Sequence, residues 1–230
     1  MRRLVLFDVD GTLLSAGGIS GRAMTRAFVA VFGTAGDHPS YDFSGKTDPQ
    51  IVRDLMRSAG VTDDVIDARM DLTLATYRGL LQVSLRPEHV EAKPGVPAIV
   101  AALGADRRVT LALLTGNLEP CARAKIEPLG LNPHFPFGAY GSDHESRYEL
   151  PAVAVARALE RTGTSFAGKE VVIVGDSIHD VLCGRSLGVR AVAVATGRTH
   201  RERLAAEQPD ALLDDFRDTG LALEQILGMR

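Results

Sequence analysis

The sequence predicts an α/β protein with a doubly wound, Rossmann-like parallel sheet core and an inserted all-helical cap domain. An apolar run at residues 4–7 is typical of a strand buried on both faces. Residues 16–88 then show helical periodicity and no convincing strand. After them, strand and helix patterns alternate, which indicates a parallel sheet. We therefore expect a core domain of residues 1–15 and 89–230 and a cap domain of residues 16–88.

Length, composition and charge favour a globular protein that acts on a small molecule. The chain has 230 residues, 45% of them hydrophobic and 24% charged, and a net charge of -3. This charge gives no basic patch for nucleic acid, and no apolar run reaches the ~18 residues that a membrane span requires. The first apolar run is too short for a signal peptide, and Cys121 and Cys183 lie in no metal-binding pattern. We expect free thiols, a cytoplasmic location, and a monomer or a homodimer.

The elements after the cap follow one another as helix and strand in turn. Apolar runs predict strands at 109–115, 135–140, 171–175, 191–195 and 211–213, and helical spacing predicts helices at 96–103, 118–129, 150–161 and 178–187 and at the C-terminus. Glycine and proline mark two flexible connections to the cap, at 15–18 and 86–95. Ligands of such sheets bind beyond the carboxyl ends of the strands. Both connections should lie near that edge, so the cap is a candidate lid.

Two carboxylates follow the first strand directly, in the stretch LVLFDVDGTLL. Because side chains alternate along a strand, Asp8 and Asp10 should point the same way, roughly 6 to 7 Å apart. Neighbouring acids repel each other and are costly to bury, and a bound metal ion is the simplest compensation. The alternative is that both are ordinary turn residues before Gly11.

The segment TGN follows the strand at 109–115. The hydroxyl of Thr115, the open backbone at Gly116 and the unpaired amides of the next helix would form an anion site that suits phosphate. The alternative is a strand-end threonine and a plain helix N-cap at Asn117.

The segment GDSIHD follows the strand at 171–175. Asp176 leaves this strand directly and Asp180 lies one helical turn later, so both can face one side of the helix start. Oxygen ligands without a cysteine or histidine cluster suit a hard cation such as Mg²⁺. The alternative is helix capping by Asp176 or Ser177, and we interpret His179 as a solvent-facing helix residue.

A phosphate beside Mg²⁺ needs a cation on its other side. Position excludes three lysines, because Lys125 is well inside the helix after TGN, Lys169 precedes its strand, and Lys93 lies in the linker. Arg147, in the loop after the third predicted strand, is left to grip phosphate oxygens through its planar guanidinium. The alternative is a surface arginine paired with a neighbouring glutamate.

The motifs DVDGT, TGN, a basic residue before a helix, and GDSxxD occur in this order, with a helical insert after the first. This pattern resembles the haloacid dehalogenase superfamily over essentially the whole chain, specifically its members with a helical cap. The resemblance implies that Asp8 is the nucleophile that becomes an aspartyl phosphate and that Asp10 is the general acid and base. An aspartate at position 10 suits phosphatases and phosphomutases rather than dehalogenases.

The resemblance also implies one set of residues for phosphate and one for Mg²⁺. Phosphate would be bound by Thr115, by the amides of Gly116 and Asn117, and by Arg147, which replaces the usual lysine of the family. The metal would be bound by the Asp8 carboxylate, the Asp10 backbone carbonyl and Asp176, with Asp180 in support.

In the predicted cap, the loop FSGKTDP resembles the segment that reaches into the site in phosphoglycolate phosphatases and β-phosphoglucomutases. Lys46, with Thr47 beside it, would meet a second anionic group of the substrate, and Arg22 is a further candidate for specificity. The alternative is that Thr47 or Asp48 caps a helix with Pro49 at its first position, while Lys46 is solvated.

The sequence thus predicts a Mg²⁺-dependent phosphoric monoester hydrolase that acts on a small phosphorylated metabolite, with phosphoglycolate as the leading substrate. A sugar phosphomutase of the β-phosphoglucomutase type is the alternative within the family. A non-catalytic regulator phosphorylated on Asp8 is the alternative from another class, and the cap and Asp10 count against it.

Overall fold

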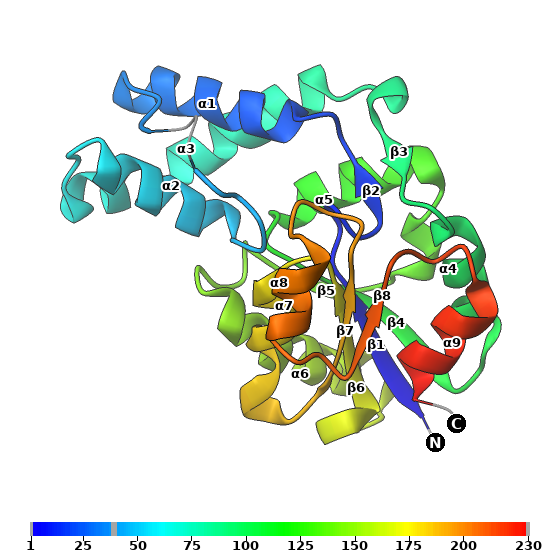
Figure 1. Cartoon of the computed structure of the whole chain (residues 1–230). Coiled ribbons are helices and arrows are strands. Elements are labelled where there is room, and N and C mark those ends of the chain that lie inside the picture. The colour runs from blue at the N-terminus through cyan, green and yellow to red at the C-terminus, as the bar shows by residue number, and fades with distance from the viewer. Residues whose placement is uncertain (1, 38–40, 229–230) are drawn as a thin grey trace.

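The computed structural model describes residues 2–37 and 41–228, which form a parallel sheet flanked by helices and a helical unit beyond one edge of the sheet (Figure 1). Within these residues, six strands lie in the order β5-β4-β1-β6-β7-β8, and every neighbouring pair is parallel. Their bounds are β1 Arg3–Phe7, β4 Val109–Thr115, β5 Gly138–Tyr140, β6 Val171–Gly175, β7 Arg190–Val194 and β8 Ala211–Leu213. The predicted α/β fold class is confirmed.

The central position of β1 determines which strand ends meet. Phe7, its last residue, pairs with Leu113 of β4 on one side and with Val174 of β6 on the other. The chain runs outward from β1 in both directions, so the strand order reverses there. The segments that follow β1, β4 and β6 therefore lie side by side at the point where ligands of such sheets bind.

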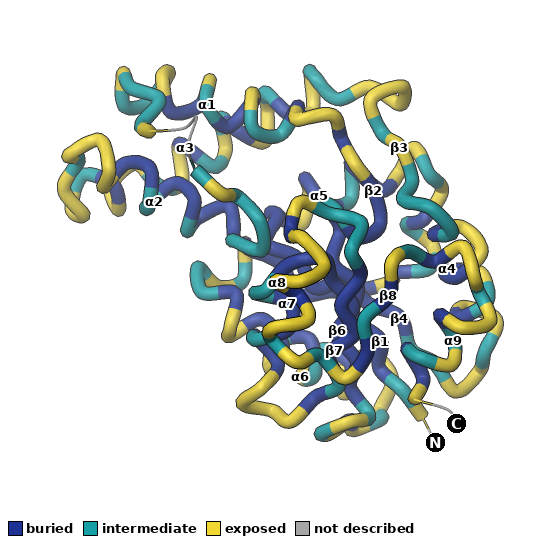
Figure 2. Tube along the Cα trace, viewed as in Figure 1, coloured by how far each residue is buried: buried dark blue, intermediate teal, exposed yellow. Residues whose placement is uncertain are grey.

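The alternation of side chains along β1 divides the core into two apolar clusters. Phe7 belongs to the cluster covered by α4 (Val96–Ala105) and α9 (Thr219–Leu227). Leu6 points the other way, into the cluster covered by α6 (Leu150–Thr162). Figure 2 shows the strands buried between these layers. A strand covered on both faces needs apolar residues in succession, which is the pattern that predicted it.

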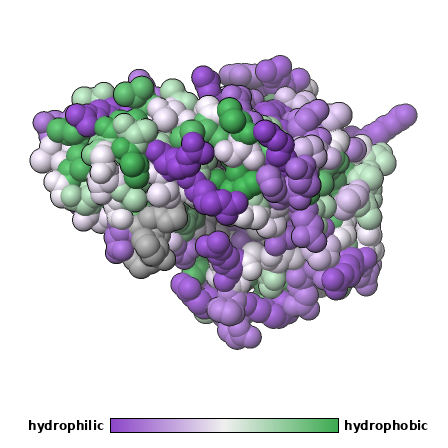
Figure 3. All heavy atoms as spheres, turned by 90° about the horizontal axis from the view of Figure 1, so that it is seen from above, coloured by the Kyte–Doolittle hydropathy of each residue, from purple (hydrophilic) through white to green (hydrophobic). Residues whose placement is uncertain are grey.

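In the described part of the chain, the unit beyond the sheet consists of three helices, α1 (Ile19–Phe32), α2 (Asp48–Ser58) and α3 (Asp63–Ser84). Their inward side chains share one apolar cluster, which Leu118 and Cys121 at the start of α5 (Glu119–Ile126) complete. The cap helices therefore pack on the core through α5. Several large hydrophobic residues of this unit are exposed, including Leu72 and Val83, and Figure 3 shows hydrophobic side chains over this side of the molecule. The division at residues 16 and 88 stays a prediction.

The two connections between sheet and cap pair with each other. β2 (Leu14–Ser15) and β3 (Glu91–Ala92) form a two-stranded antiparallel sheet. The sequence predicted flexible linkers here, and the pairing arises because both connections cross the same gap in opposite directions. The cap is thus joined to the sheet by a hydrogen-bonded ribbon.

Two helices are shorter than the sequence predicts. α5 ends at Ile126 and α7 (Ile178–Cys183) ends before Gly184, and each continues as a short 3-10 turn. Pro128 cannot donate the next helical hydrogen bond, and glycine is a poor helix former. α8 (Arg201–Ala206) is a short helix that the sequence did not predict.

Cys121 and Cys183 are buried free thiols, as predicted. Among the described residues, no helix combines the length and the apolar character that a membrane crossing demands.

Candidate active site

Three carboxylates converge at the carboxyl edge of the sheet. Asp8 follows β1, Asp176 follows β6, and Asp180 lies in the first turn of α7. One oxygen of each lies within 4.8 Å of the others, and all three residues are buried. This all-oxygen donor set fits one hard divalent cation.

Burial and mutual repulsion oppose the charged forms of these acids. Burial raises the pKa of Asp8 to about 7, the Arg147 guanidinium opposes the rise, and the neighbouring Asp180 and Asp10 add to it. Burial also raises the pKa of Asp176 well above its usual range, with further contributions from Asp8 and Asp180. A divalent cation would compensate this negative charge, so the electrostatics and the donor chemistry both fit a metal.

Arg147 lies inside the acidic cluster. Its Nη2 donates to Asp8 Oδ1 at 3.1 Å, to the Leu114 carbonyl at 3.3 Å, and to a carboxylate oxygen of Asp180. Its side chain is only 2% exposed, so the alternative of a surface arginine is wrong. Its Nε is buried without a hydrogen-bond partner in the described part of the chain, which leaves one donor of the guanidinium for an oxygen of a ligand.

Capping of α7 leaves Asp176 available to the acidic cluster. Ser177 is the N-cap, and its hydroxyl accepts from Asp180 N at 3.2 Å while Asp180 Oδ2 accepts from Ser177 N at 3.0 Å. The capping alternative therefore holds for Ser177. Asp176 Oδ1 accepts from Thr12 Oγ1 at 3.0 Å instead. His179 is half-buried beside Tyr148 rather than fully solvated.

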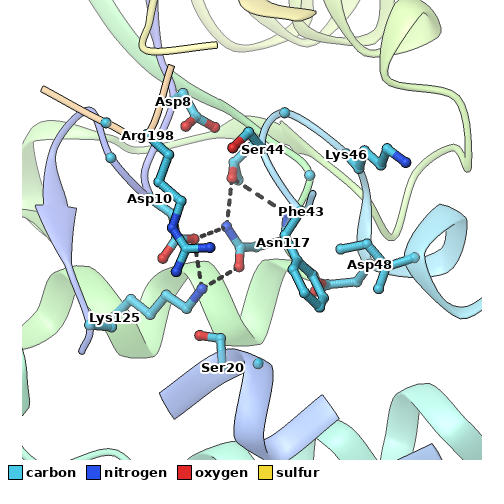
Figure 4. Close-up of a pocket in the computed structure, with 18 of the residues that line it drawn as sticks. Asp8, Asp10, Ser20, Phe43, Ser44, Lys46, Asp48, Asn117, Lys125 and Arg198 are labelled. Atoms are coloured by element: carbon cyan, nitrogen blue, oxygen red, sulfur yellow. Dashed lines mark hydrogen bonds and ion pairs between the residues drawn. The ribbon is translucent and has the colours of Figure 1, made fainter. Parts of the chain in front are cut away.

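Asp10 belongs to a second polar group beside the acidic cluster. Its Oδ2 accepts from Lys125 Nζ at 2.6 Å and from Asn117 Nδ2 at 2.8 Å (Figure 4). Lys125 also donates to Asn117 Oδ1 at 2.6 Å, and Asn117 Nδ2 donates to Thr115 Oγ1 at 2.7 Å. The side chain of Asp10 is 43% exposed although that of Lys125 is 1% exposed. Asp10 therefore stays accessible while one of its oxygens is held in place.

The exclusion of Lys125 and Lys93 from the site was wrong, because Lys125 pairs with Asp10 and both residues line the pocket. Lys125 lies about two turns into α5, but side chains lean toward the N-terminus of their helix, so a long one reaches back over the preceding turn. Burial lowers the pKa of Lys125, yet the charges of Asp10 and Asp48 raise it above its usual value. No local sequence pattern reports how far this side chain reaches back over its helix, so the sequence offered no signal for it.

The loop before α2 docks the cap on TGN. Asp48 N donates to the Gly116 carbonyl at 2.7 Å, and Asp48 Oδ2 accepts from Leu118 N at 2.8 Å. A Cβ on Gly116 would lie 2.0 Å from the Lys46 carbonyl oxygen, so the close approach requires glycine. Burial raises the pKa of Asp48 to about 6, against the opposing effects of Lys125 and of the Leu118 amide.

Docking uses part of the anion site that the sequence predicted. Leu118 N is bound by Asp48, and Asn117 N lies 3.4 Å from Thr115 Oγ1. Leu118 rather than Asn117 is the N-cap of α5, so the capping alternative at Asn117 is wrong. Thr115, Gly116 and Asn117 all line the pocket, and their role in phosphate binding stays a prediction.

Lys46 and Arg22 both line the pocket, with different partners. Lys46 Nζ pairs with Asp54 Oδ2 at 3.0 Å and donates to the Tyr41 hydroxyl at 2.9 Å, and Figure 4 shows its side chain pointing away from Asp10. Arg22 Nη1 donates to the Gly17 carbonyl at 3.1 Å, and Arg22 has no ion pair with a carboxylate of residues 2–37 or 41–228.

Thr47 is buried and shapes the cap loop. Its hydroxyl accepts from Gln50 N at 3.2 Å as the N-cap of α2, and it donates to the Glu145 carbonyl at 2.5 Å. Pro49 lies in the first turn of that helix, as the capping alternative expects. Thr47 thus ties the cap to the loop that carries Arg147.

The acidic cluster, the Asp10 group and the cap loop enclose one cavity of about 500 Å³. Its cap side includes apolar and aromatic residues, among them Met24, Ile51 and Tyr77, and its core side is mostly polar. A mostly formed cavity of this size with a few convergent polar groups is typical of a small-molecule site.

Known families and relatives resemble this chain over most of its length. Residues 5–194 match the family described as haloacid dehalogenase-like hydrolase. Phosphoglycolate phosphatase 1 of Pseudomonas aeruginosa is 26% identical over 223 residues, covering 94% of this chain and 78% of the relative. Phosphoglycolate phosphatase of Agrobacterium fabrum is 27% identical over 220 residues, covering 93% of this chain and 88% of the relative.

Solved structures share the fold. A haloacid dehalogenase-like family hydrolase from Streptococcus pneumoniae superimposes with a TM-score of 0.65 at 18% identity. The superposition covers 96% of this chain and 97% of the hydrolase chain. CbbY from Rhodobacter sphaeroides, in complex with phosphate, gives a TM-score of 0.66 at 20% identity with the same two coverages, 96% and 97%.

Proposed function

Because the chain belongs to the haloacid dehalogenase-like hydrolase family and is a phosphatase of that family, we propose that it hydrolyses a small phosphate monoester, with Mg²⁺, through an aspartyl phosphate on Asp8. One observation carries the proposal. Asp8 is a buried carboxylate that lines the pocket together with Asp10 and lies within 4.8 Å of Asp176 and Asp180. This arrangement supports the proposal of a nucleophile, an accessible acid and a cation site at one end of a single cavity.

The proposed metal site consists of Asp8 and Asp176, with Asp180 in support and the Asp10 backbone carbonyl as a further ligand. The residues fit Mg²⁺, which takes a few carboxylates and leaves other positions to water and substrate phosphate. When bound, Mg²⁺ reduces the repulsion between the Asp8 carboxylate and the phosphate oxygens.

In the first step, an oxygen of Asp8 attacks phosphorus while the bond from phosphorus to the ester oxygen breaks. The departing oxygen takes that electron pair together with a proton from Asp10, which enters the step as the carboxylic acid. Lys125 and Asn117 hold one oxygen of Asp10, so the other is available to the leaving group. Thr115 and Arg147 bind the phosphate oxygens.

In the second step, water attacks the phosphorus of the aspartyl phosphate and gives a proton to the Asp10 carboxylate. The bond from phosphorus to Asp8 breaks, inorganic phosphate leaves, and both aspartates return to their starting forms. The accessible side chain of Asp10 supports this role, because water must reach it.

Phosphoglycolate is the leading substrate because relatives from two genera carry the name phosphoglycolate phosphatase. A small phosphorylated metabolite also suits the volume of the cavity, about 500 Å³. We further propose a cytoplasmic protein, monomeric or homodimeric, without a nucleic-acid partner. A sugar phosphomutase stays the alternative, since the same two aspartates would serve transfer to a sugar hydroxyl.

Phosphate release from p-nitrophenyl phosphate and from phosphoglycolate, with Mg²⁺ and with a chelator, tests the proposal. We expect Mg²⁺-dependent turnover that falls by at least ~10³-fold in Asp8→Asn. Arg161→Gln, an exposed arginine on α6, is the control and should retain activity. Isomerisation of a sugar phosphate without phosphate release would favour the mutase. A protein that accepts one phosphoryl group and never turns over would be the regulator instead.

A further inference from the structure

The cations that line the pocket fall into two groups. Three are paired with carboxylates, namely Arg147 with Asp8, Lys125 with Asp10, and Lys46 with Asp54. The other three are Arg22, Lys93 and Arg198, and none of them has an ion pair with any residue in the ranges 2–37 and 41–228. The pocket therefore contains positive charge that its own carboxylates do not neutralise.

The loops that carry two of these cations are tied to the segment that follows Asp8 and Asp10. Lys93 comes directly after β3, and its backbone N donates to the Leu13 carbonyl at 3.0 Å. Arg198 follows β7, and Thr196 in the same loop donates from its hydroxyl to the Gly11 carbonyl at 2.7 Å. The backbone segments that carry Lys93 and Arg198 are thus tied to the segment that follows the nucleophile, rather than to the cap loop.

Arg198 and Arg22 also line the pocket, Arg198 from the loop after β7 and Arg22 from α1. Figure 4 shows the Arg198 guanidinium reaching into the pocket toward Asp10 and Lys125. Arg22, in the first turn of α1, is held by the carbonyl of Gly17. Arg198 is exposed and has no ion pair within the described residues, so its charge is available to an anion on the ligand.

We propose that Arg198, Lys93 and Arg22 form an anion-binding surface that recognises a second anionic group on the leaving group of the substrate. This inference rests on the proposed phosphatase function and narrows its substrate class to doubly anionic esters. It assigns selectivity to residues of the core, the ribbon and α1 rather than to Lys46, whose ammonium is already paired with Asp54. A carboxylate and a second phosphate share the required chemistry.

The test compares phosphate esters of similar size that differ in the charge of the leaving group. Phosphoglycolate carries a carboxylate, ethyl phosphate carries no further charge, and phosphoethanolamine carries an ammonium. 1,2-Ethanediol bisphosphate, which also has a two-carbon skeleton, provides the arm with a second phosphate. We expect wild-type kcat/KM to favour an anionic leaving group over ethyl phosphate by about 10-fold or more, and to favour ethyl phosphate over phosphoethanolamine. Which anionic ester is preferred distinguishes carboxylate from phosphate recognition.

Arg198→Gln and Lys93→Gln should each reduce this preference by about 3- to 10-fold, mainly through KM, because each removes one charge-assisted contact. The preference should also decrease at high ionic strength, since Arg198 is exposed. Lys46→Gln is the matched variant for the cap loop, and Arg161→Gln is the surface control, and both should leave the ratio of the esters unchanged.

Two results would overturn the inference and leave the phosphatase function in place. The first is an equal loss for all esters in Arg198→Gln and Lys93→Gln. The second is a preference that disappears in Lys46→Gln alone. If the wild-type protein with Mg²⁺ released phosphate from none of the esters, the proposed function itself would fail, and the inference with it.

Discussion

The two halves of the active site are held in place by different parts of the fold. The acidic half, which consists of Asp8, Asp176 and Asp180, is buried and comes from the ends of adjacent strands and the helix that follows one of them. The second half, centred on Asp10 and Lys125, depends on α5 and on the cap loop that docks against it.

The acidic half therefore depends on strand register alone, whereas the second half also needs the cap. In the acidic half, the parallel pairing of β1 with β6 fixes the relative positions of Asp8 and Asp176. In the second half, Asp48 of the cap bonds Leu118, the residue that begins α5. We therefore expect changes in the acidic half to affect stability and metal binding first, and changes in the second half to affect turnover and cap docking.

Arg147→Met should give the largest effect on stability. The variant keeps most of the side-chain volume but leaves the buried charges of Asp8 and Asp180 without their cation, which costs about 3 to 5 kcal/mol of unfolding free energy. Chemical denaturation in chelator at pH 7.5 measures it, and added Mg²⁺ should restore part of the loss. Arg157→Met, which breaks a less buried pair with Asp143, should cost about 1 kcal/mol or less. Equal losses in the two variants would show that the acidic half does not depend on Arg147.

Lys125→Met should mainly reduce turnover. Without the ammonium, Asp10 loses its shortest hydrogen bond, so kcat should fall by about 10²-fold, within the range for a displaced general acid and base. The pH profile of kcat should also move, which a purely structural role would not produce. Lys169→Met removes a lysine paired with Asp210 on the surface and should change neither quantity. An unchanged pH profile in Lys125→Met would separate Lys125 from the function of Asp10.

Lys125 also marks the limit of what the sequence could predict. The strands, their parallel order and the positions of Asp8, Asp10 and Asp176 follow from short apolar runs that end in acids, because a parallel sheet brings such ends together. Lys125 belongs to the interior of a helix, and its use depends on how far a side chain leans back over a turn. The position of a residue along the sequence does not give the distance that its side chain reaches.

The cap illustrates the same limit from the other side. Helical periodicity predicts its helices, and the capping pattern around Thr47 and Pro49 predicts the start of α2. The partner of Lys46 is Asp54, two turns further along the chain, and the ribbon of β2 with β3 joins segments that are far apart in sequence. Pairings of this kind depend on tertiary structure, so composition and local pattern do not reveal them.

Asp48→Asn should give the smallest effect, and this effect should be on the pH dependence of stability. Burial raises the pKa of Asp48 from 3.8 to about 6, so the folded protein binds this proton more tightly than the unfolded chain. The stabilisation is fully present below pH ~4 and is lost as pH rises through about 6. At ~1.4 kcal/mol per pKa unit, the two-unit shift corresponds to at most about 3 kcal/mol.

Denaturation in chelator at several pH values between 4.5 and 7.5 measures this dependence. Asp8 and Asp176, whose pKa values are also raised, contribute in the same direction in both proteins, so the difference between wild type and Asp48→Asn isolates Asp48. We expect the wild type to lose more stability than the variant over this range, while Asp71→Asn, at an exposed position on α3, follows the wild type. If the unfolding free energy changed with pH equally in wild type and Asp48→Asn, the charge of the Asp48 carboxylate would not be buried against Leu118. The cap would then be held to the core by the backbone bond to Gly116, by the contacts of Thr47 and Arg53 with Glu145, and by apolar packing on α5.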